Sequence, residues 1–289
     1  MKTNDAIELF LEARVGIRQP KTILWYKGNL GLFSSFIGDK KEIENITIHD
    51  LRSWRATLVR RNLSAWSIHG YLRSVKVFFK WLSLEDVVPE NPALRLEFPR
   101  LPQSPRRGIL DKDRDAMILT ARDRPRDFAI FMFAATTGCR EDGLATLLLK
   151  NLNVKNMQAM VTEKGMKSRF VYFEDETKRA LERWLDMRPL VETDRVFVSI
   201  TGEPLTTVGI YQIFKRTAIR ADVKDNWSPH QWRHAFARNF LKNGGGLGIL
   251  SQLLGHSDVR VTLSHYGGLA NEDLQRAHYK YVPKLMIKY

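Results

Sequence analysis

The stretch from Ser228 to Tyr266 reads SPHQWRHAFARNFLKNGGGLGILSQLLGHSDVRVTLSHY, and it decides how the rest of the chain is interpreted. Ser-Pro at its start is typical of a helix N-terminus. The run Asn243–Gly246 interrupts the apolar pattern, because successive glycines favour a turn. Two helices are therefore predicted here. The stretch also collects most of the chain's histidines with an arginine and a tyrosine, namely His230, Arg233, His234, His256, His265 and Tyr266.

The pentapeptide His230–His234 is a candidate anion site at the start of the first of these helices. His230, Arg233 and His234 share one helical face, because residues three and four apart are neighbours. A guanidinium and imidazoles near a helix N-terminus suit a phosphate group. A solvated basic face and a zinc site remain alternatives. Against zinc, Gln231 stands where a zinc protease would have its glutamate, and Arg233 would place a cation beside the metal.

Arg140 is a second candidate, about ninety residues upstream. A very apolar helix is expected over residues 125–136 and ends at Gly138, so Arg140 lies in the turn that follows a buried helix. An ion pair of Arg140 with Glu141 or Asp142 is the structural alternative.

A basic hairpin is the third candidate. Residues 159–162 and 170–173 alternate in polarity like two strands. The turn between them carries Lys164 and Lys167, which could equally be ordinary surface charges.

The chain before residue 100 has the pattern of a small helical bundle, with strand signals nearly absent. Helices are expected at residues 4–14, 20–38, 47–61 and 64–82. The proline-rich, basic segment Pro99–Gly108 cannot be a continuous helix and is predicted to link two domains. The predicted divisions are a helical domain at 1–98, the linker at 99–108, and a second domain at 109–289. Further helices are expected there at 111–122, 143–150, 174–187 and 206–221.

The composition indicates a polyanionic partner. The 289 residues carry a formal charge of +14 with a pI near 9.9, which favours nucleic acid first and an anionic membrane surface second. The single cysteine, Cys139, excludes an internal disulfide and fits a reducing compartment. No apolar run approaches the roughly 18 residues of a membrane span. A soluble, cytoplasmic protein is expected.

Taken together, these elements resemble the tyrosine recombinase (phage integrase) superfamily, of the simple two-domain, Xer-like type, over nearly the whole chain. The matching elements stand in the family's order: Thr137-Gly138-Cys139-Arg140, the hairpin segment Lys164–Arg169, His230–His234, Leu253-Leu254-Gly255-His256 and Tyr266. The resemblance implies a mainly α fold with a small β-sheet. It also implies an N-terminal helical SAM-like bundle and a C-terminal mixed α/β catalytic domain, which together form a C-shaped clamp on double-stranded DNA.

The resemblance further implies a site-specific recombinase that works through a covalent 3′-phosphotyrosine intermediate, without cofactor or metal. Arg140 and Arg233 would clamp the scissile phosphate, and Lys164 would protonate the departing 5′-oxygen. His230 would be the general base for Tyr266, and His256 would contact the phosphate or orient the tyrosine. Lys167 is the alternative to Lys164.

Contacts to DNA are expected from both domains, and the protein is expected to act as a tetramer on a specific recombination site. The residues expected to touch DNA are Ser64, Trp66, His69, Arg73, Lys76, Arg106, Arg107, Lys167 and Arg169. The chain starts directly in its first helix, which resembles simple recombinases acting on short paired sites. The tail after Asn271 is expected to dock on a neighbouring protomer.

Two positions depart from the family pattern. Gly143 stands where the family usually has an acid three residues after the first arginine, so Glu141 or Asp142 is expected to substitute. Tyr266 is the tenth residue after His256 instead of the ninth, which is His265. These departures leave a rival function, a DNA-binding protein of the same fold without catalysis. A second rival, suggested by the histidines, is a metal-dependent nuclease.

Overall fold

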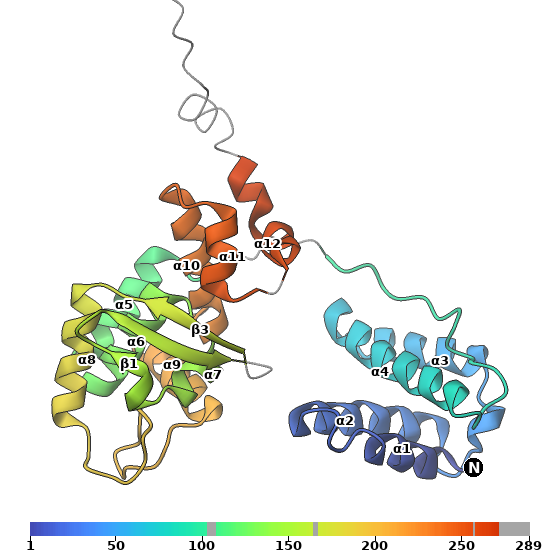
Figure 1. Ribbon diagram of the computed structural model, residues 1–289. Coiled ribbons are helices and arrows are strands. Elements are labelled where there is room, and N and C mark those ends of the chain that lie inside the picture. The colour runs from blue at the N-terminus through green and yellow to red at the C-terminus, as the bar shows by residue number, and fades with distance from the viewer. Residues whose placement is uncertain (103–107, 164–166, 257, 272–289) are drawn as a thin grey trace, which may run out of the picture. The chain divides into compact units, whose positions relative to one another are not determined.

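The computed structural model describes residues 1–102, 108–163, 167–256 and 258–271 (Figure 1). Contacts within the chain divide it into two compact units, Met1–Ser104 and Pro105–Tyr289. Each unit has its own buried apolar core.

The first unit is built from helices around an aromatic core. Its elements are α1 (Thr3–Glu12), α2 (Pro20–Ile37), the 3-10 turn Ile43–Asn45, α3 (Ile48–Arg60) and α4 (Ala65–Leu84). Phe10 packs edge-on against Phe78, with ring centroids 5.3 Å apart. Thr47 and Asp50 form a capping box that begins α3, and the Ser64 hydroxyl accepts from the Ser67 amide to begin α4. The predicted helical bundle is confirmed.

The second unit combines helices with a small antiparallel sheet. Its helices are α5 (Asp111–Ala121), α6 (Pro125–Thr137), α7 (Glu141–Thr146), α8 (Asp175–Met187), α9 (Thr207–Arg220), α10 (Pro229–Lys242), α11 (Leu247–Leu254) and α12 (Val259–Asn271), with a 3-10 turn at Leu149–Asn151. The strands β1 (Leu152–Asn153), β2 (Gln158–Glu163) and β3 (Lys167–Tyr172) lie in that order in the sheet. The mainly α fold class with a small β-sheet is thus confirmed.

Strand alternation decides which side chains of β2 and β3 face inward. On β2, Ala159, Val161 and Glu163 are buried, and the residues between them are partly exposed. Because Val161 pairs with Arg169 across the hairpin, Arg169 lies on the same inner face. The hairpin therefore presents an acid and an arginine toward the interior of the unit.

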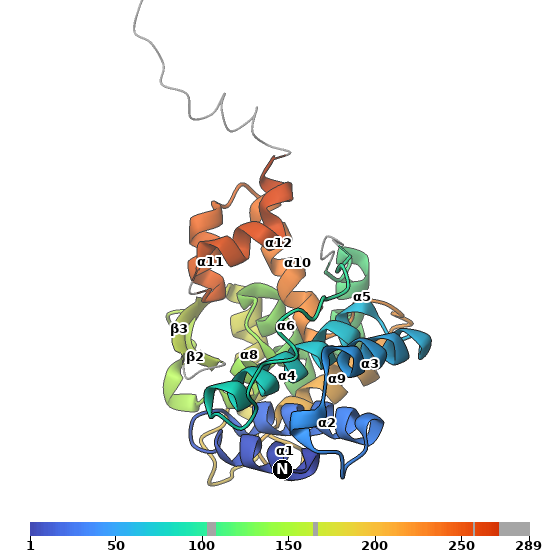
Figure 2. The same ribbon diagram turned by 90° about the vertical axis from the view of Figure 1, so that its right-hand side faces the viewer.

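The stretch Ser228–Tyr266 holds three helices, where two are predicted. The additional break follows Gly255, which adopts a left-handed conformation (φ 65°) and ends α11. The chain then begins α12, which carries Tyr266. Helices α10, α11 and α12 pack together, and α11 also contacts β3 (Figure 2).

The helix predicted at residues 143–150 is shorter and begins earlier. Helix α7 ends at Thr146, because Leu147 adopts an extended conformation and its carbonyl accepts from the Val196 amide at 2.9 Å. An isolated β-bridge between Leu148 and Arg195 continues this pairing. A long-range backbone pairing therefore overrides the local helical pattern.

Candidate active site

Arg140 is delivered to the site by a tight turn. Gly138 caps α6 in the left-handed conformation (φ 57°), and a Cβ there would lie 2.4 Å from the Phe236 ring. Two residues later, Arg140 is the N-cap of α7. The Gly138 carbonyl accepts from Arg233 Nη1 at 2.9 Å, so the turn itself is tied to α10.

Arg233 is the most deeply buried cation of the site, with a side chain only 2% exposed. In addition to the Gly138 carbonyl, it donates from Nη2 to the Leu254 carbonyl at the end of α11. Burial lowers its pKa to about 10, while Glu163 opposes the shift. Arg233 therefore stays protonated at neutral pH and links α6, α10 and α11.

Glu163 lies at the centre of the cationic cluster. Its Oε1 accepts from the Arg140 amide at 2.7 Å and from Arg169 Nη2 at 3.0 Å, and lies 3.8 Å from Arg233 Nη1. Its Oε2 pairs with Arg140 Nη1. Burial alone would raise the pKa of this carboxyl, but Arg169, Arg233 and Arg140 hold it below its ordinary value. Three cations around one anion leave a net charge of +2, which suits an anionic ligand.

His256 closes the cluster from the turn after α11. Its Nε2 lies 3.3 Å from Arg233 Nη2, and its Nδ1 lies 2.7 Å from the Thr262 hydroxyl. Burial, followed by repulsion from Arg233 and Arg140, lowers its pKa from 6.5 to about 4. His256 is therefore neutral at pH 7, and its Nε2 can accept from Arg233 while Nδ1 donates to Thr262.

This shifted pKa predicts a pH dependence of stability in the DNA-free protein. Between about 4 and 6.5 the unfolded chain protonates His256 and the folded chain does not, so the free energy of unfolding falls as the pH drops through this window. In a His256→Asn variant, the melting temperature should depend less steeply on pH between these values. The exposed His49 provides the control, His49→Asn. Equal pH slopes for His256→Asn and the parent protein would contradict the assignment.

Tyr266 is only 2% exposed and packs among apolar side chains of α10 and α11, including Leu241 and Leu254. Its hydroxyl shares a short hydrogen bond with Nδ1 of His234, one turn along α10 from His230. The rings of His230 and His234 lie edge-on, with centroids 4.6 Å apart. His230 itself is exposed.

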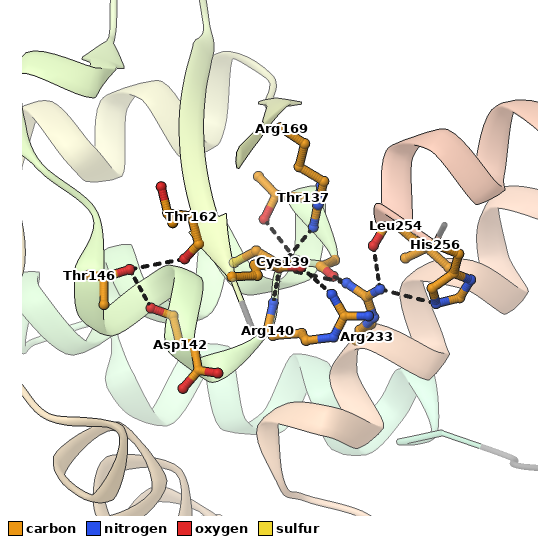
Figure 3. A network of polar contacts seen from close by, with 12 residues as sticks. Thr137, Cys139, Arg140, Asp142, Thr146, Thr162, Arg169, Arg233, Leu254 and His256 are labelled. Atoms are coloured by element: carbon orange, nitrogen blue, oxygen red, sulfur yellow. Dashed lines mark hydrogen bonds and ion pairs between the residues drawn. The ribbon is translucent and has the colours of Figure 1, made fainter. Parts of the chain in front are cut away.

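A cavity of about 480 Å³ opens over the arginine cluster, within the second unit. It is lined by Arg140, Glu163, Lys167, Ser168, Arg169, Gly255, His256 and Val261. Figure 3 shows Arg140, Arg169 and Arg233 converging from α7, β3 and α10. Arg169 lines the cavity as well, and its Nε and Nη1 are buried without a hydrogen-bond partner among the described residues. The cavity thus offers several donors to one anion.

The structure brings together Arg140, Arg233 and His256, as the resemblance implies. Lys164 lies outside the described residues, whereas Lys167 begins β3 with an exposed side chain at the cavity. Arg169, expected on a DNA-facing surface, is turned inward toward Glu163.

Of the residues expected to touch DNA from the first unit, some are exposed and others pack against a neighbouring aromatic ring. On α4, Trp66 and Arg73 are exposed. His69 instead packs on Phe98, with ring centroids 4.7 Å apart, and the Lys76 ammonium lies 5.4 Å from the same ring. Ser64 is the exposed N-cap of α4. Arg106 and Arg107 lie outside the described residues.

Three functional candidates escaped the sequence reasoning: Glu163, His234 as the partner of Tyr266, and Thr262. Glu163 had a readable signal, since it continues the inward positions Ala159 and Val161 of β2. The acid expected beside Arg140 was Glu141 or Asp142, and the structure places the Glu163 carboxylate there.

The residues that the structure describes contain no group of three or more His, Cys, Asp or Glu side chains suited to hold a metal ion. Within the same part of the chain, none of the helices has the length and apolar character to cross a membrane.

Sequence comparisons identify relatives of both units. Residues 109–272 match the Phage integrase family, and residues 7–86 match the phage integrase N-terminal SAM-like domain. The chain is 30% identical over 257 residues to tyrosine recombinase XerC of Alcanivorax borkumensis, covering 84% of this chain and 82% of that protein. It is 31% identical over 257 residues to tyrosine recombinase XerC of Pseudomonas syringae pv. syringae, covering 84% of each.

Solved structures share the fold. XerA recombinase is 26% identical, covers 98% of this chain and 100% of its own, and superposes with a TM-score of 0.54. The Tn1549 transposon integrase bound to transposon right end DNA is 18% identical with the same coverage and a TM-score of 0.81, which shows the fold alone. Because the family match spans more than half of the chain and XerC relatives reach 30% identity over most of it, the chain belongs to the phage integrase family, the tyrosine recombinases that cleave and rejoin DNA.

Proposed function

We propose that Tyr266 is the nucleophile of this recombinase and that the cationic cavity binds the scissile phosphate of a specific duplex site. The observation that carries the proposal is a net-positive cavity lined by Arg140 and His256, with the buried Arg233 3.3 Å from His256 and with Val261 of α12, the helix that bears the tyrosine, in the same lining. Several solved structures with this fold are complexes with DNA, among them a XerH recombinase bound to its palindromic difH substrate.

The proposed reaction needs only the side chains of the chain and the DNA. The phenol oxygen of Tyr266 attacks phosphorus, its proton leaves, and the bond from phosphorus to the 5′-oxygen breaks. Arg140 and Arg233 stabilise the charge that develops on the non-bridging oxygens, as fixed donors in a partly buried site. The product is a 3′-phosphotyrosine bond with a free 5′-hydroxyl, which preserves the bond energy for rejoining to another strand.

Proton transfer from the tyrosine is assigned to the histidines of α10. His234 holds the hydroxyl in the structure described here, and His230, whose ring contacts that of His234, is the proposed general base. Since Tyr266 is buried and does not line the cavity, its hydroxyl must exchange His234 for the phosphate before it attacks.

Protonation of the departing 5′-oxygen is assigned to Lys164, which follows Glu163 directly in the chain. Lys167 lines the cavity and is the alternative donor. Replacing each lysine in turn by alanine and measuring cleavage of a substrate with a 5′-phosphorothiolate leaving group separates them. That leaving group needs no proton, so it restores activity only to the variant that lacks the true donor.

DNA binding through several phosphates predicts a steep salt dependence. Each Lys or Arg contact should contribute about one unit to the log–log slope of affinity against salt. Arg73, exposed on α4, is proposed as one such contact. Arg73→Ala should lower the slope by about one, measured by fluorescence anisotropy on a labelled duplex between about 50 and 200 mM salt. Arg183→Ala is the control, because Arg183 belongs to the second unit and its guanidinium is already engaged there by the Arg122 carbonyl. An unchanged slope in Arg73→Ala would remove Arg73 from the interface.

Strand exchange joins two sites, each holding two protomers, so we propose a tetramer on DNA. The tail from Asn271 to Tyr289 is amphipathic in sequence and is proposed to dock on the neighbouring protomer. The cytoplasm is the proposed location, as suits a protein that acts on DNA and has a single cysteine. Short paired sites are the proposed targets.

A nicked suicide duplex tests the function directly. A duplex is first selected from a randomised pool by its binding to the full chain, then nicked near the cleavage position and incubated with the protein in EDTA. A covalent adduct, mapped by mass spectrometry to Tyr266, is the expected result. Binding without an adduct would favour the catalytically inactive DNA-binding protein. Cleavage that EDTA abolishes would favour the metal-dependent nuclease.

A further inference from the structure

We propose that Glu163 is a positioning residue for cleavage, which holds the phosphate-binding arginines in place from β2 and occupies the space that Gly143 leaves open in α7. The inference rests on the proposed function of the same site. It concerns an acid on strand β2 that contacts Arg140 although it lies 23 residues further along the chain.

The contacts of Glu163 are those of an organising group. One carboxylate bonds the backbone amide and the guanidinium of Arg140, pairs with Arg169, and lies within 3.8 Å of Arg233. Arg140 is thereby held at two points, which fixes both the turn and the direction of its side chain. The Glu163 side chain is 4% exposed, so water cannot replace these bonds.

The charge balance of the cluster gives Glu163 a second effect. Without its carboxylate, Arg140, Arg169 and Arg233 would face one another as unbalanced cations in a partly buried site. With it, a net positive charge remains, and the buried donors Nε and Nη1 of Arg169 still lack partners among the described residues. Glu163 thus orders the arginines without neutralising the cavity.

Gly143 explains how the carboxylate fits. A Cβ at position 143 would lie 3.4 Å from Val161 Cβ, and 3.5 Å from both Cys139 Cβ and Glu163 Cγ, which are ordinary contact distances. Its backbone is outside the left-handed region, so a side chain is sterically allowed. A side chain at 143 and the side chain of Glu163 therefore project into the same volume. An acid placed on α7 could deliver its carboxylate to the cluster if the acid on β2 were removed.

An exchange of the two residues tests the proposal. The proteins are the parent chain, Glu163→Gln, Glu163→Gly, and the double variant Glu163→Gly with Gly143→Glu. The readout is the single-turnover rate of adduct formation on the nicked duplex, together with DNA affinity and melting temperature. Glu182→Gln, an exposed acid on α8, is the control for loss of one negative charge.

Glu163→Gln and Glu163→Gly should form adduct about 10²-fold more slowly, because a small misplacement of a catalytic group has an effect of this size. The double variant should recover at least about tenfold over Glu163→Gly, although the acid now comes from another element. DNA affinity should change far less than the rate.

Two results would overturn the inference. One is an unimpaired rate in Glu163→Gln beside an active parent protein. The other is a double variant that regains the parent melting temperature but not its rate, since a carboxylate supplied from α7 to a folded site would then fail to position the arginines. A parent protein that forms no adduct would instead refute the proposed function itself, which keeps the two failures distinct.

Discussion

Replacing Tyr266 by phenylalanine is expected to reduce covalent adduct formation by at least about 10⁴-fold, because removal of a nucleophile eliminates the step it performs. DNA affinity should be nearly unchanged, since Tyr266 is buried against α10 and α11 and its hydroxyl bonds to His234. The measurement is gel separation of protein–DNA adducts after incubation with the nicked duplex, with anisotropy for binding.

The matched control is Tyr211→Phe, which removes an exposed phenol hydroxyl from α9 and should leave the adduct rate intact. An adduct that persists in Tyr266→Phe would assign the attack to another tyrosine. The candidates beyond α12 are Tyr279, Tyr281 and Tyr289. His265 occupies the usual family position, so a His265→Tyr, Tyr266→Phe double variant shows whether a nucleophile one residue earlier can reach the phosphate.

Replacing Arg233 by lysine is expected to slow adduct formation by about 10³-fold, even though the positive charge is kept. A lysine ammonium cannot reproduce a planar fork that donates to the Gly138 and Leu254 carbonyls. At least one buried carbonyl then loses its partner, and the free energy of unfolding should fall by about 2–4 kcal/mol. Single-turnover kinetics and urea unfolding measure the two effects.

Arg238→Lys is the control on the same helix. Its guanidinium donates to the Ile109 carbonyl at 3.0 Å, so some stability should be lost while the adduct rate stays near that of the parent protein. A rate for Arg233→Lys within about tenfold of the parent rate would contradict the clamp role, because that is less than the effect of removing one preorganised donor.

The sequence carried enough information for the two-unit architecture and for the half of the site that is marked by local signals. Arg140 follows a glycine that ends an apolar helix, and the His230–His234 pentapeptide stands at a helix N-terminus. Such signals depend on neighbours in the chain. They can therefore be recognised in the sequence without knowledge of the tertiary packing.

Glu163 was missed because its role depends on packing between distant segments. Its partners Arg140 and Arg233 lie 23 and 70 residues away in the chain, and only the alternation of β2 indicates that it points inward. The third helix of the stretch Ser228–Tyr266 was missed for a related reason. Leu254-Gly255-His256-Ser257 was interpreted only as a functional motif. Its glycine also adopts the left-handed conformation that ends α11, and α12 begins after it.

The bonds of Arg233 to two backbone carbonyls have a consequence for the evolution of the chain. In many enzymes an active-site side chain can be lost with a gain in stability, so inactive descendants persist as binding proteins. At position 233 the guanidinium that serves the phosphate also fastens the ends of α6 and α11. Substitution there lowers activity and stability together, so selection acts against such descendants on both counts. Relatives of this chain that have lost catalysis but still bind DNA should therefore have replaced Tyr266 first and kept Arg233.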